Sequence, residues 1–510
     1  MTTSRILFGL AHLILFQTWM LGSARAVDTI VVCAESFQPD LQPWLEHRRG
    51  EGMTISVVAS SSDVHQVRRS IREAADDSTR YVVLVGDAPV IGSPCDPAKC
   101  IPINYWPTTV TAKWGSTPTL SSDLSYGDFD DDGVPEAVVG RMPVDTPVEL
   151  QQAIKRIIAY EASDDFGDWR NEVQLVCGMG GFGMMADAAI ESVTRSVITG
   201  VLPMATRTNV AYASEGHPFC PVRQPFTESV LANYRSGARF WVYAGHGQVT
   251  ELDRFPQTED GIPVLDPTSA ARLDCRAAAS PIAVLLACYT GAMDAPDDSI
   301  AESMWLAKGG PIAVIAGSRV TMPYGNTTAA MGLIDGVFDQ RLPRLGDAWL
   351  STLGDMHRET EPDPANSRMM IDALATMISP AGTVLSDERR EHMLLYNLIG
   401  DPTLTMHHPQ TIKLNVPASH QAGDNVVVGW SSPVSGEVKI RIDRPLGAAT
   451  KGDANDTTVA SIQTQALAGK QMIMAFKLPL DTIGPLIVRV SVAGEYSWAA
   501  GATQTIMRAP

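Results

Sequence analysis

This chain contains a series of short apolar runs that are continuous rather than alternating. A strand with one solvent-facing side alternates apolar and polar residues, whereas a strand covered on both faces is apolar throughout. Continuous runs therefore predict an α/β fold with largely parallel sheets covered by helices. The runs are TIVVCA (29–34), TISVVA (54–59), YVVLVGD (81–87), EAVVGRMPV (136–144), EVQLVCG (172–178), RFWVYAG (239–245), PIAVLLAC (281–288) and PIAVIAG (311–317).

Helical patterns separate these runs and divide them into two groups. Stretches 41–49 and 64–75 follow the first two runs, and a helix pattern at 147–161 follows the fourth. The strand pattern then restarts near residue 172. We therefore predict two packed α/β units, at 27–164 and 165–406, that together form one catalytic region.

The composition changes after Met406. Short segments such as NVVVGW and EVKIRID alternate apolar and polar residues and are separated by turn signals, which predicts a β-sandwich at 411–510. This region has no cysteine, and its one histidine, His420, lies in the polar turn PASHQAG. We therefore expect every catalytic residue to lie before Met406.

The N-terminus has the pattern of a secretory signal peptide at 1–26. Arg5 precedes a mostly apolar segment at 6–21, and Ala24-Arg25-Ala26 fits a small-x-small cleavage site. We expect the protein to be secreted or periplasmic. No later segment has about 20 unbroken apolar residues, so no membrane insertion of the mature chain is predicted.

The charge balance limits the partners of the chain. It carries 57 acidic and 39 basic side chains, a net charge of −18. Cleavage after Ala26 removes two arginines and no acid, which leaves 37 basic side chains and a net charge of −20. This excess of negative charge excludes nucleic acid and anionic lipid as electrostatically favoured partners. The sequence does not predict the oligomeric state.

The seven cysteines are an odd number, so at least one thiol stays unpaired in an oxidising compartment. Cys33 and Cys177 lie inside apolar runs and are interpreted as small buried hydrophobes. Cys95 and Cys100 share a proline-rich loop and could pair with each other. Cys288 differs from these because it directly follows a predicted buried strand.

Cys288 and His246 both lie where predicted parallel strands end. Ligands of α/β proteins bind at the carboxyl ends of such strands. A thiolate that attacks and an imidazole that moves protons are the requirements of Cys–His catalysis. The N–H groups of Gly247 and Cys288 are candidate donors to an oxyanion. The alternative is a loop histidine between glycines and a structural buried cysteine.

Five ordered sequence blocks resemble the gingipain-type cysteine peptidases, which are relatives of the caspases. The blocks are SDLSYGDFDDDGVPEAVVGRMPV (122–144), YAGHG (243–247), LLACYTG (285–291), SIAESMWLAKGGPIAVIAGSR (299–319) and YNLIGDPTL (396–404). The resemblance implies a caspase-like fold, a His246–Cys288 catalytic dyad, and an oxyanion hole made by Gly247 and Cys288. It also implies that the trailing sandwich is immunoglobulin-like.

The resemblance does not extend to substrate preference. Arginine-specific members of that family have an acidic residue in the pocket for the residue before the scissile bond. The matching stretch here, GMGGFGMMADAAIES (178–192), aligns poorly, so neither Asp187 nor Glu191 can be assigned that role. Where those members have an aromatic pocket lid, this chain has AGSRVTMPYG, with Arg319 and Tyr324.

The stretch DFDDDGVPE predicts a structural Ca²⁺ site. Asp128, Asp130 and Asp132 alternate before a glycine, with Glu136 four residues beyond Asp132, a spacing with which short loops wrap calcium. The twelfth position is Val139, so the bidentate glutamate of an EF-hand is absent. The alternative is a solvated acidic turn.

The stretch GMGGFG (178–183) favours a rival class, a nucleotide-dependent oxidoreductase. It matches the G-x-G-x-x-G fingerprint between a strand and a helix. The fingerprint also needs an acidic residue about 20 positions on, and VLPMATRTN (201–209) contains none. The alternative is a turn beside the dyad, and we expect no organic cofactor.

Together these patterns predict a secreted cysteine endopeptidase that hydrolyses peptide bonds in protein or peptide substrates through an acyl-enzyme. The alternatives are a sortase-like transpeptidase on the same scaffold, in which an amine resolves the acyl-enzyme, and a non-catalytic pseudopeptidase or adhesin.

Overall fold

A computed structural model describes residues 26–181, 183–221, 224–256, 260–358, 367–379, 382–448 and 452–509. The predicted signal peptide lies almost entirely outside these residues. Within them, no helix combines the length and the apolar character needed to cross a membrane.

The main feature is a ten-stranded sheet in the order β2-β1-β3-β6-β14-β13-β12-β9-β7-β8, which confirms the predicted α/β class. Every pairing is parallel except that of β13 with β14. The strands are β1 (Thr29–Cys33), β2 (Ile55–Ala59), β3 (Tyr81–Val85), β6 (Val138–Met142), β7 (Glu172–Cys177), β8 (Arg207–Tyr212), β9 (Phe240–Ala244), β12 (Ile282–Leu286), β13 (Ala313–Gly317) and β14 (Tyr396–Ile399).

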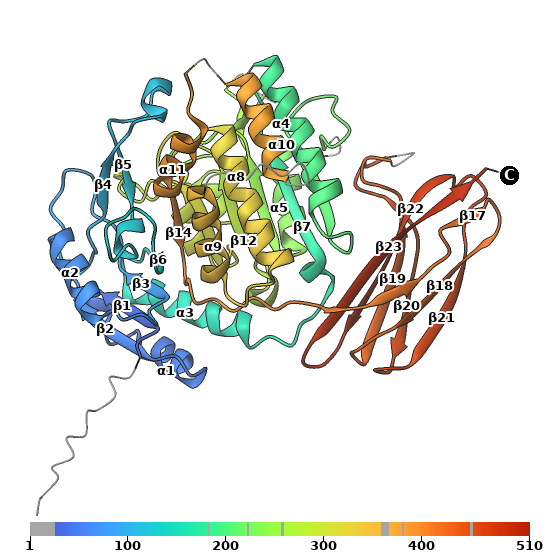
Figure 1. The fold of residues 1–510 in the computed structure, drawn as a ribbon, viewed down its shortest axis with the longest axis horizontal. Helices are drawn as coiled ribbons and strands as arrows, with labels where there is room; N and C mark the ends of the chain where they lie inside the picture. Colours follow the sequence, from blue (N-terminus) through green and yellow to red (C-terminus); the bar gives the residue numbers. More distant parts are fainter. Residues whose placement is uncertain are drawn as a thin grey trace, which may run out of the picture.

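The two predicted units meet edge to edge in this sheet rather than as separate packed sheets. The chain returns from the second unit to insert β14 between β13 and β6, where Ile399 pairs with Arg141. β14 runs antiparallel to β13 because the chain re-enters the sheet at the end where β13 leaves it, so that Tyr396 pairs with Gly317. Figure 1 shows the N-terminal unit in blue to teal beside the second unit in green to orange. One cluster of buried residues runs through both units.

Helices cover both faces of the sheet. Trp241 of β9 packs against Tyr234 of α5 on one face, whereas its neighbour Val242 points toward α4 and α8 on the other. The helices are α1 (Gln42–Gly50), α2 (Val64–Ala74), α3 (Pro147–Glu161), α4 (Met184–Ser196), α5 (Phe226–Arg235), α6 (Pro267–Ala270), α7 (Ile300–Leu306), α8 (Pro323–Ile334), α9 (Leu345–His357), α10 (Ser367–Ile378) and α11 (Leu385–Leu395).

Local sequence explains where several helices begin. Thr146 and Glu149 form a capping box at the start of α3, and Pro147 occupies the first helical position. Ser299 and Glu302 form the same box at α7. Each box satisfies backbone N–H groups that have no partner within the helix.

The C-terminal region forms a β-sandwich around its own core, to which both of its sheets contribute. Trp430 of one sheet and Val488 of the other are both fully buried there. The strands are β15 (Gln410–Thr411), β16 (Lys413–Asn415), β17 (Ser419–Gln421), β18 (Asn425–Ser431), β19 (Gly436–Asp443), β20 (Thr458–Ala466), β21 (Gln471–Lys477), β22 (Gly484–Ala493) and β23 (Trp498–Arg508). Two short strand pairs belong neither to the large sheet nor to the sandwich: β4 (Asn104–Pro107) with β5 (Thr119–Ser122), and β10 (Arg254–Phe255) with β11 (Ile262–Pro263).

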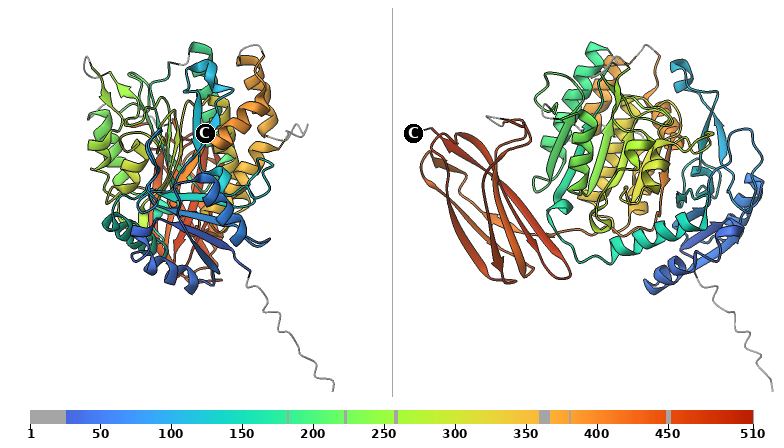
Figure 2. Two further views of the ribbon diagram at one scale, coloured as in Figure 1. Left: turned by 90° about the vertical axis from the view of Figure 1, so that its left-hand side faces the viewer. Right: turned by 180° about the vertical axis from the view of Figure 1, so that it is seen from behind.

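The sandwich packs beside the β8 end of the large sheet (Figure 2). The Asn455 side chain accepts from Val210 N at 2.8 Å and donates to Val210 O at 2.9 Å. These bonds satisfy the outward backbone groups of an edge strand, which would otherwise be open to pairing with another chain. Phe166 also packs with Trp498 and Ala500 across the same interface.

Candidate active site

His246 follows β9 at the carboxyl end of the large sheet. The backbone there is tightly packed: a Cβ on Gly245 would lie 2.7 Å from the Tyr243 hydroxyl oxygen and 2.8 Å from Gly178 Cα. The Tyr243 hydroxyl donates a hydrogen bond to the His246 carbonyl at 2.7 Å. These contacts fix the conformation of the turn that carries His246, whose imidazole is exposed.

The imidazole of His246 is oriented by the backbone of the GMGGFG segment. Its Nε2 lies 2.9 Å from the Gly180 carbonyl oxygen. Because a carbonyl only accepts, Nε2 carries the proton in this contact, and Nδ1 is the basic nitrogen of the neutral ring. Gly180 and Gly181 have φ of +78° and +100°, a backbone region that favours glycine. The glycines thus shape a turn beside His246, and no sequence signal identified Gly180 as its partner.

Cys288 follows β12 and is half-buried. Its Sγ accepts a hydrogen bond from Thr321 N at 3.3 Å and lies 3.6 Å from Thr321 O. The next residue, Tyr289, has φ of +59°, an uncommon conformation for a residue with a side chain. This sharp turn ends the strand directly behind the thiol, and strained backbone of this kind is found at functional sites.

Gly247 lies directly against the Cys288 turn. A Cβ at this position would come within 2.6 Å of Thr290 Cγ2, 2.8 Å of Cys288 O and 2.9 Å of Ala287 Cβ. No side chain fits there without displacing the backbone around the thiol. The His246–Gly247 and Ala287–Cys288 segments are therefore packed together, as the sequence analysis expected of two strand ends.

The sheet register explains this juxtaposition. Leu286 pairs with Ala244 in the parallel strands β12 and β9, and each is two residues before its candidate catalytic residue. Neighbouring strands are about 5 Å apart. The thiol and the imidazole therefore leave the sheet at the same level from adjacent strands.

A buried ion pair holds the Cys288 turn from behind. Arg319 donates to Asp294 at 2.6 and 2.9 Å, and Ser121 donates to the same carboxylate at 3.0 Å. Burial raises the pKa of Asp294, but the hydrogen bond and charge of Arg319 outweigh it and keep that pKa below its ordinary value. The Arg319 carbonyl in turn accepts from Tyr289 N at 2.9 Å. Arg319 thus supports the turn, and this role was not predicted.

Comparison with known proteins places the chain in a family. A family model for peptidase family C25 matches residues 23–407. The chain belongs to peptidase family C25. It is therefore a cysteine-type peptidase, a hydrolase whose substrates are proteins or peptides, as the sequence analysis predicted.

Solved structures share the fold of this C25 peptidase. The crystal structure of the Arg-specific cysteine proteinase gingipain R (RgpB) matches with a TM-score of 0.54 at 16% identity, over 95% of this chain and 98% of that chain. A complex of Porphyromonas gingivalis RgpB pro- and mature domains matches with a TM-score of 0.54 at 15% identity, over 94% and 99%. At such identities the likeness shows a common fold. No curated protein matches the sequence significantly.

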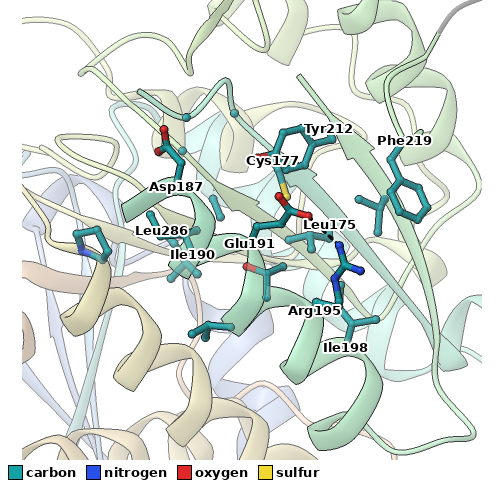
Figure 3. Close-up of a pocket in the computed structure, with 18 of the residues that line it drawn as sticks. Leu175, Cys177, Asp187, Ile190, Glu191, Arg195, Ile198, Tyr212, Phe219 and Leu286 are labelled. Carbon is teal, nitrogen blue, oxygen red and sulfur yellow. Dashed lines mark hydrogen bonds and ion pairs between the residues drawn. The ribbon is translucent and has the colours of Figure 1, made fainter. Parts of the chain in front are cut away.

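A pocket of about 380 Å³ opens beside Cys288 in this C25 peptidase. Figure 3 labels lining side chains from β7, β8, β12 and α4, together with Ile198 after α4 and Phe219 after β8. Leu446 and Gly447, in the loop between β19 and β20, also line it. The sandwich therefore contributes to this pocket, although every candidate catalytic residue lies before Met406.

Behind the same site, His392 on α11 is fully buried. Its Nε2 accepts from Met322 N at 2.8 Å, and its Nδ1 donates to Glu388 O at 2.7 Å. A Cβ on Gly325 would come within 2.3 Å of the ring, so α8 and α11 are packed face to face here. Burial lowers the pKa of His392 to about 4.

We expect His392 to make the protein sensitive to mild acid. Its pKa rises from about 4 in the folded state to about 6.5 in the unfolded state, so protons favour unfolding. The free energy of unfolding is therefore highest above pH 6.5 and falls as the pH decreases toward 4. The total decrease is up to about 3 kcal/mol, because each unit of difference between the two pKa values is worth about 1.36 kcal/mol. Urea unfolding at pH 7 and pH 4.5 measures this loss.

His392→Asn should reduce the difference between the two pH values by about 2 kcal/mol, because the titrating ring is gone. The exposed His65 on α2 offers a matched control, and His65→Asn should leave the difference unchanged. Equal pH dependence in His392→Asn and the wild type would contradict the assignment.

The acidic loop after β5 gathers part of the predicted calcium set. Carboxylate oxygens of Asp128, Asp130 and Glu136 lie within 4.8 Å of one another. Asp132 is not in this group, and its Oδ1 accepts from Val134 N at 2.7 Å. Asp131, which was not predicted to take part, turns outward at φ +65° to pair with Arg68 and Arg72. The loop thus offers three of the four predicted ligands.

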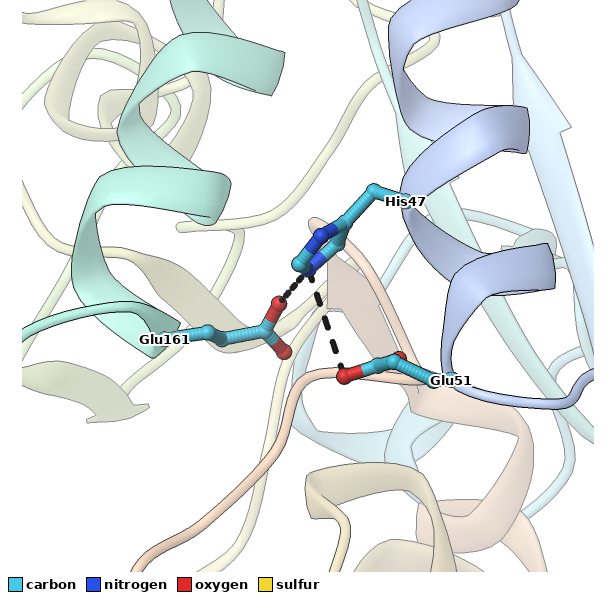
Figure 4. A group of neighbouring side chains, drawn as sticks. All are labelled: His47, Glu51 and Glu161. Atoms are coloured by element: carbon cyan, nitrogen blue, oxygen red, sulfur yellow. Dashed lines mark hydrogen bonds and ion pairs between the residues drawn. The ribbon is translucent and has the colours of Figure 1, made fainter. Parts of the chain in front are cut away.

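A second cluster of potential ligands consists of His47, Glu51 and Glu161 (Figure 4). Arg48 Nη1 donates to both carboxylates, at 2.8 Å to Glu161 and 2.9 Å to Glu51. Glu161 also accepts from Thr405 N at 2.7 Å. A guanidinium already neutralises these acids, so the cluster is an ion-pair network that ties α1, α3 and the chain after β14 together.

Proposed function

We propose that this C25 peptidase hydrolyses peptide bonds with Cys288 as nucleophile and His246 as general base and acid. The observation that carries the proposal is the contact of the two strand ends, where Gly247 packs without room for a Cβ against the Cys288 turn. Thiolate attack and proton transfer need both groups at one carbonyl.

The reaction follows from these positions. Cys288 Sγ forms a bond to the substrate carbonyl carbon, and its proton passes to His246 Nδ1, the basic nitrogen when Nε2 donates to Gly180. The oxyanion is stabilised by the N–H groups of Gly247 and Cys288. His246 protonates the leaving amine as the C–N bond breaks, which leaves a thioester. Water, deprotonated by His246, then releases the acid and restores the thiol.

The purified protein, incubated with a mixed peptide library, tests this function directly. We expect cleavage that stops on alkylation with iodoacetamide, and peptide mapping should place the adduct on Cys288. Added amines separate hydrolysis from transpeptidation, because a transpeptidase forms the amide product. Cleavage that survives complete alkylation of Cys288 would contradict the proposal.

We further propose that Asp128, Asp130 and Glu136 hold a structural Ca²⁺. Hard cations of this kind take carboxylate oxygens, and the three groups are close enough to share one ion. Bound calcium would also relieve the repulsion among the clustered acids. It would take no part in the chemistry.

Chelation should lower the melting temperature, because an ion that binds only the folded state stabilises it by mass action. At 100 times the dissociation constant this is worth about 2.7 kcal/mol, or about 3 °C for a protein of this size. Asp130→Asn should weaken the response, whereas Asp274→Asn, at an exposed acid outside the loop, should not. If neither chelator nor added calcium changes the melting temperature, the loop is a solvated acidic turn and the proposed calcium site is wrong.

The proposal includes export through the signal peptide at 1–26 and an immunoglobulin-like topology for the sandwich. The signal peptide is supported by its sequence pattern, and the sandwich by its two sheets around one core. Sequencing of the mature N-terminus after expression tests the cleavage at Ala26.

A further inference from the structure

The pocket is lined in part by Cys288, whose Sγ is the proposed nucleophile. Cys288, Gly178 and Gly245 are among its lining residues, and a second cavity, which shares Ala244 and Leu286 with it, lies over the face of the sheet between α4 and α8. The carbonyl carbon that Sγ attacks belongs to the residue before the scissile bond. The side chain of that residue is therefore the part of a substrate placed nearest to the cavity.

The floor of the pocket is apolar. Leu175, Cys177 and Val210 form a buried cluster on neighbouring strands. Ile198 and Leu286 continue this surface, as Figure 3 shows. A pocket of about 380 Å³ is large enough for an aromatic side chain, and an apolar floor favours one that leaves no polar group without a hydrogen bond.

The outer wall is aromatic and is completed by the sandwich. Tyr212 stacks on His217 with ring centroids 4.3 Å apart, and Phe219 lies next to His217. Leu446 packs against the same apolar cluster. A Cβ on Gly447 would lie 3.5 Å from Phe219, so the β19–β20 loop rests directly on this wall.

The acidic residues of the pocket are engaged with groups of the protein. Glu191 accepts from Arg195 at 2.8 Å on the same helix. Asp187 accepts from Gly181 N at 3.1 Å, in the turn that also holds Gly180. A substrate guanidinium or ammonium would have to compete with these donors and leave water for an apolar floor, which is costly without a dedicated carboxylate.

We propose that this pocket takes a large apolar side chain, aromatic or long aliphatic, from the substrate residue before the scissile bond, and that Leu446 and Gly447 of the sandwich complete its outer wall. The inference rests on the proposed function, because it assumes that Cys288 is the nucleophile. It makes the C-terminal sandwich a determinant of substrate preference.

A set of fluorogenic peptides that differ only in the residue before the scissile bond tests the preference with the full-length protein. We expect kcat/KM for phenylalanine, leucine and methionine to exceed that for alanine by about 100-fold, since each methylene placed in an apolar pocket is worth about 10-fold or more. Arginine and lysine should fall near alanine. Equal rates for all residues, or a preference for arginine or lysine, would overturn the inference while leaving the peptidase function intact.

Variants of the loop test the role of the sandwich. Leu446→Asp should lower kcat/KM for the phenylalanine peptide by about 10-fold, while the alanine peptide changes by less than about two-fold, because a charge is then placed against the aromatic ring. Leu446→Met, which keeps an apolar side chain at this position, should retain the wild-type kcat/KM for the phenylalanine peptide. The matched control is Leu467→Asp, at an exposed leucine in the turn that follows the other end of β20 and leads to the second sheet of the sandwich, which should alter neither rate.

The ratio of the two rates separates this role from a structural one, because a destabilised protein loses both activities together. If Leu446→Asp leaves the ratio unchanged, the loop is not part of the pocket and the inference fails. If no peptide is cleaved at all, the proposed function fails, and the inference fails with it.

Discussion

Cys288→Ala and His246→Ala will each abolish peptide-bond hydrolysis, with a fall in kcat of at least about 10⁴-fold and no loss of folded structure. Without the thiol no covalent intermediate forms, and without the imidazole no group moves the proton from sulfur to the leaving amine. Because the two residues act as a unit, the double variant should be hardly worse than either single one. Initial rates on a cleaved library peptide measure the loss.

Controls exist within the same chain. Cys275 is buried and its thiol donates to Ala279 O at 3.2 Å, so Cys275→Ala should retain turnover. His65→Ala, at an exposed histidine on α2, should do the same. Circular dichroism and the melting temperature establish that each variant is folded. Substantial hydrolysis by folded Cys288→Ala would remove the proposed mechanism.

The largest effect on stability is expected from Arg141→Met, at about 3–5 kcal/mol. Arg141 is fully buried on β6 and donates to Asp123 at 2.6 and 2.8 Å. Burial alone would lower the pKa of Arg141, but the Asp123 carboxylate raises it above its ordinary value. Removal of the guanidinium leaves that carboxylate buried without its countercharge. Four backbone carbonyls also lose one hydrogen-bond donor each: Gly86, Asp87, Ile101 and Pro102.

Urea unfolding measures this loss. Arg272→Met is the matched control, because Arg272 pairs with Glu228 at 2.8 Å with both side chains about half exposed, and solvent-screened pairs of this kind contribute little to stability. Arg141→Met combined with Asp123→Asn should recover part of the loss, since no uncompensated charge remains. A loss near that of Arg272→Met would mean that water solvates Asp123 in the folded protein.

The positions of most sheet strands could be predicted from the sequence because burial on both faces leaves a direct mark. Each of the eight apolar runs contains a strand of the large sheet. Strands β8 and β14 carry no such mark: β8 is a partly exposed edge strand, RTNVAY, and β14 has only four residues after a helix. The candidate dyad could be predicted for a related reason, because the end of a strand is recognised from the apolar run that precedes it.

The features that could not be predicted depend on contacts between residues far apart in the chain. Insertion of β14 joins the two units into one sheet because its backbone finds partners on both sides, which no local pattern encodes. Gly180 meets His246 across 66 positions, and Arg319 meets Asp294 behind the thiol only after β12 and β13 have paired.

The fold class and the candidate dyad can be read from short-range patterns, because hydrophobic periodicity and residue type act within a few positions. The shape and lining of the pocket beside Cys288 depend on how a separate domain packs. Leu446 reaches the pocket because Asn455 hydrogen-bonds the edge of β8 and the sandwich buries Phe166 against Trp498. Those side-chain contacts are few and long-range, so they leave no periodic signal in the sequence and exist only once both cores have formed.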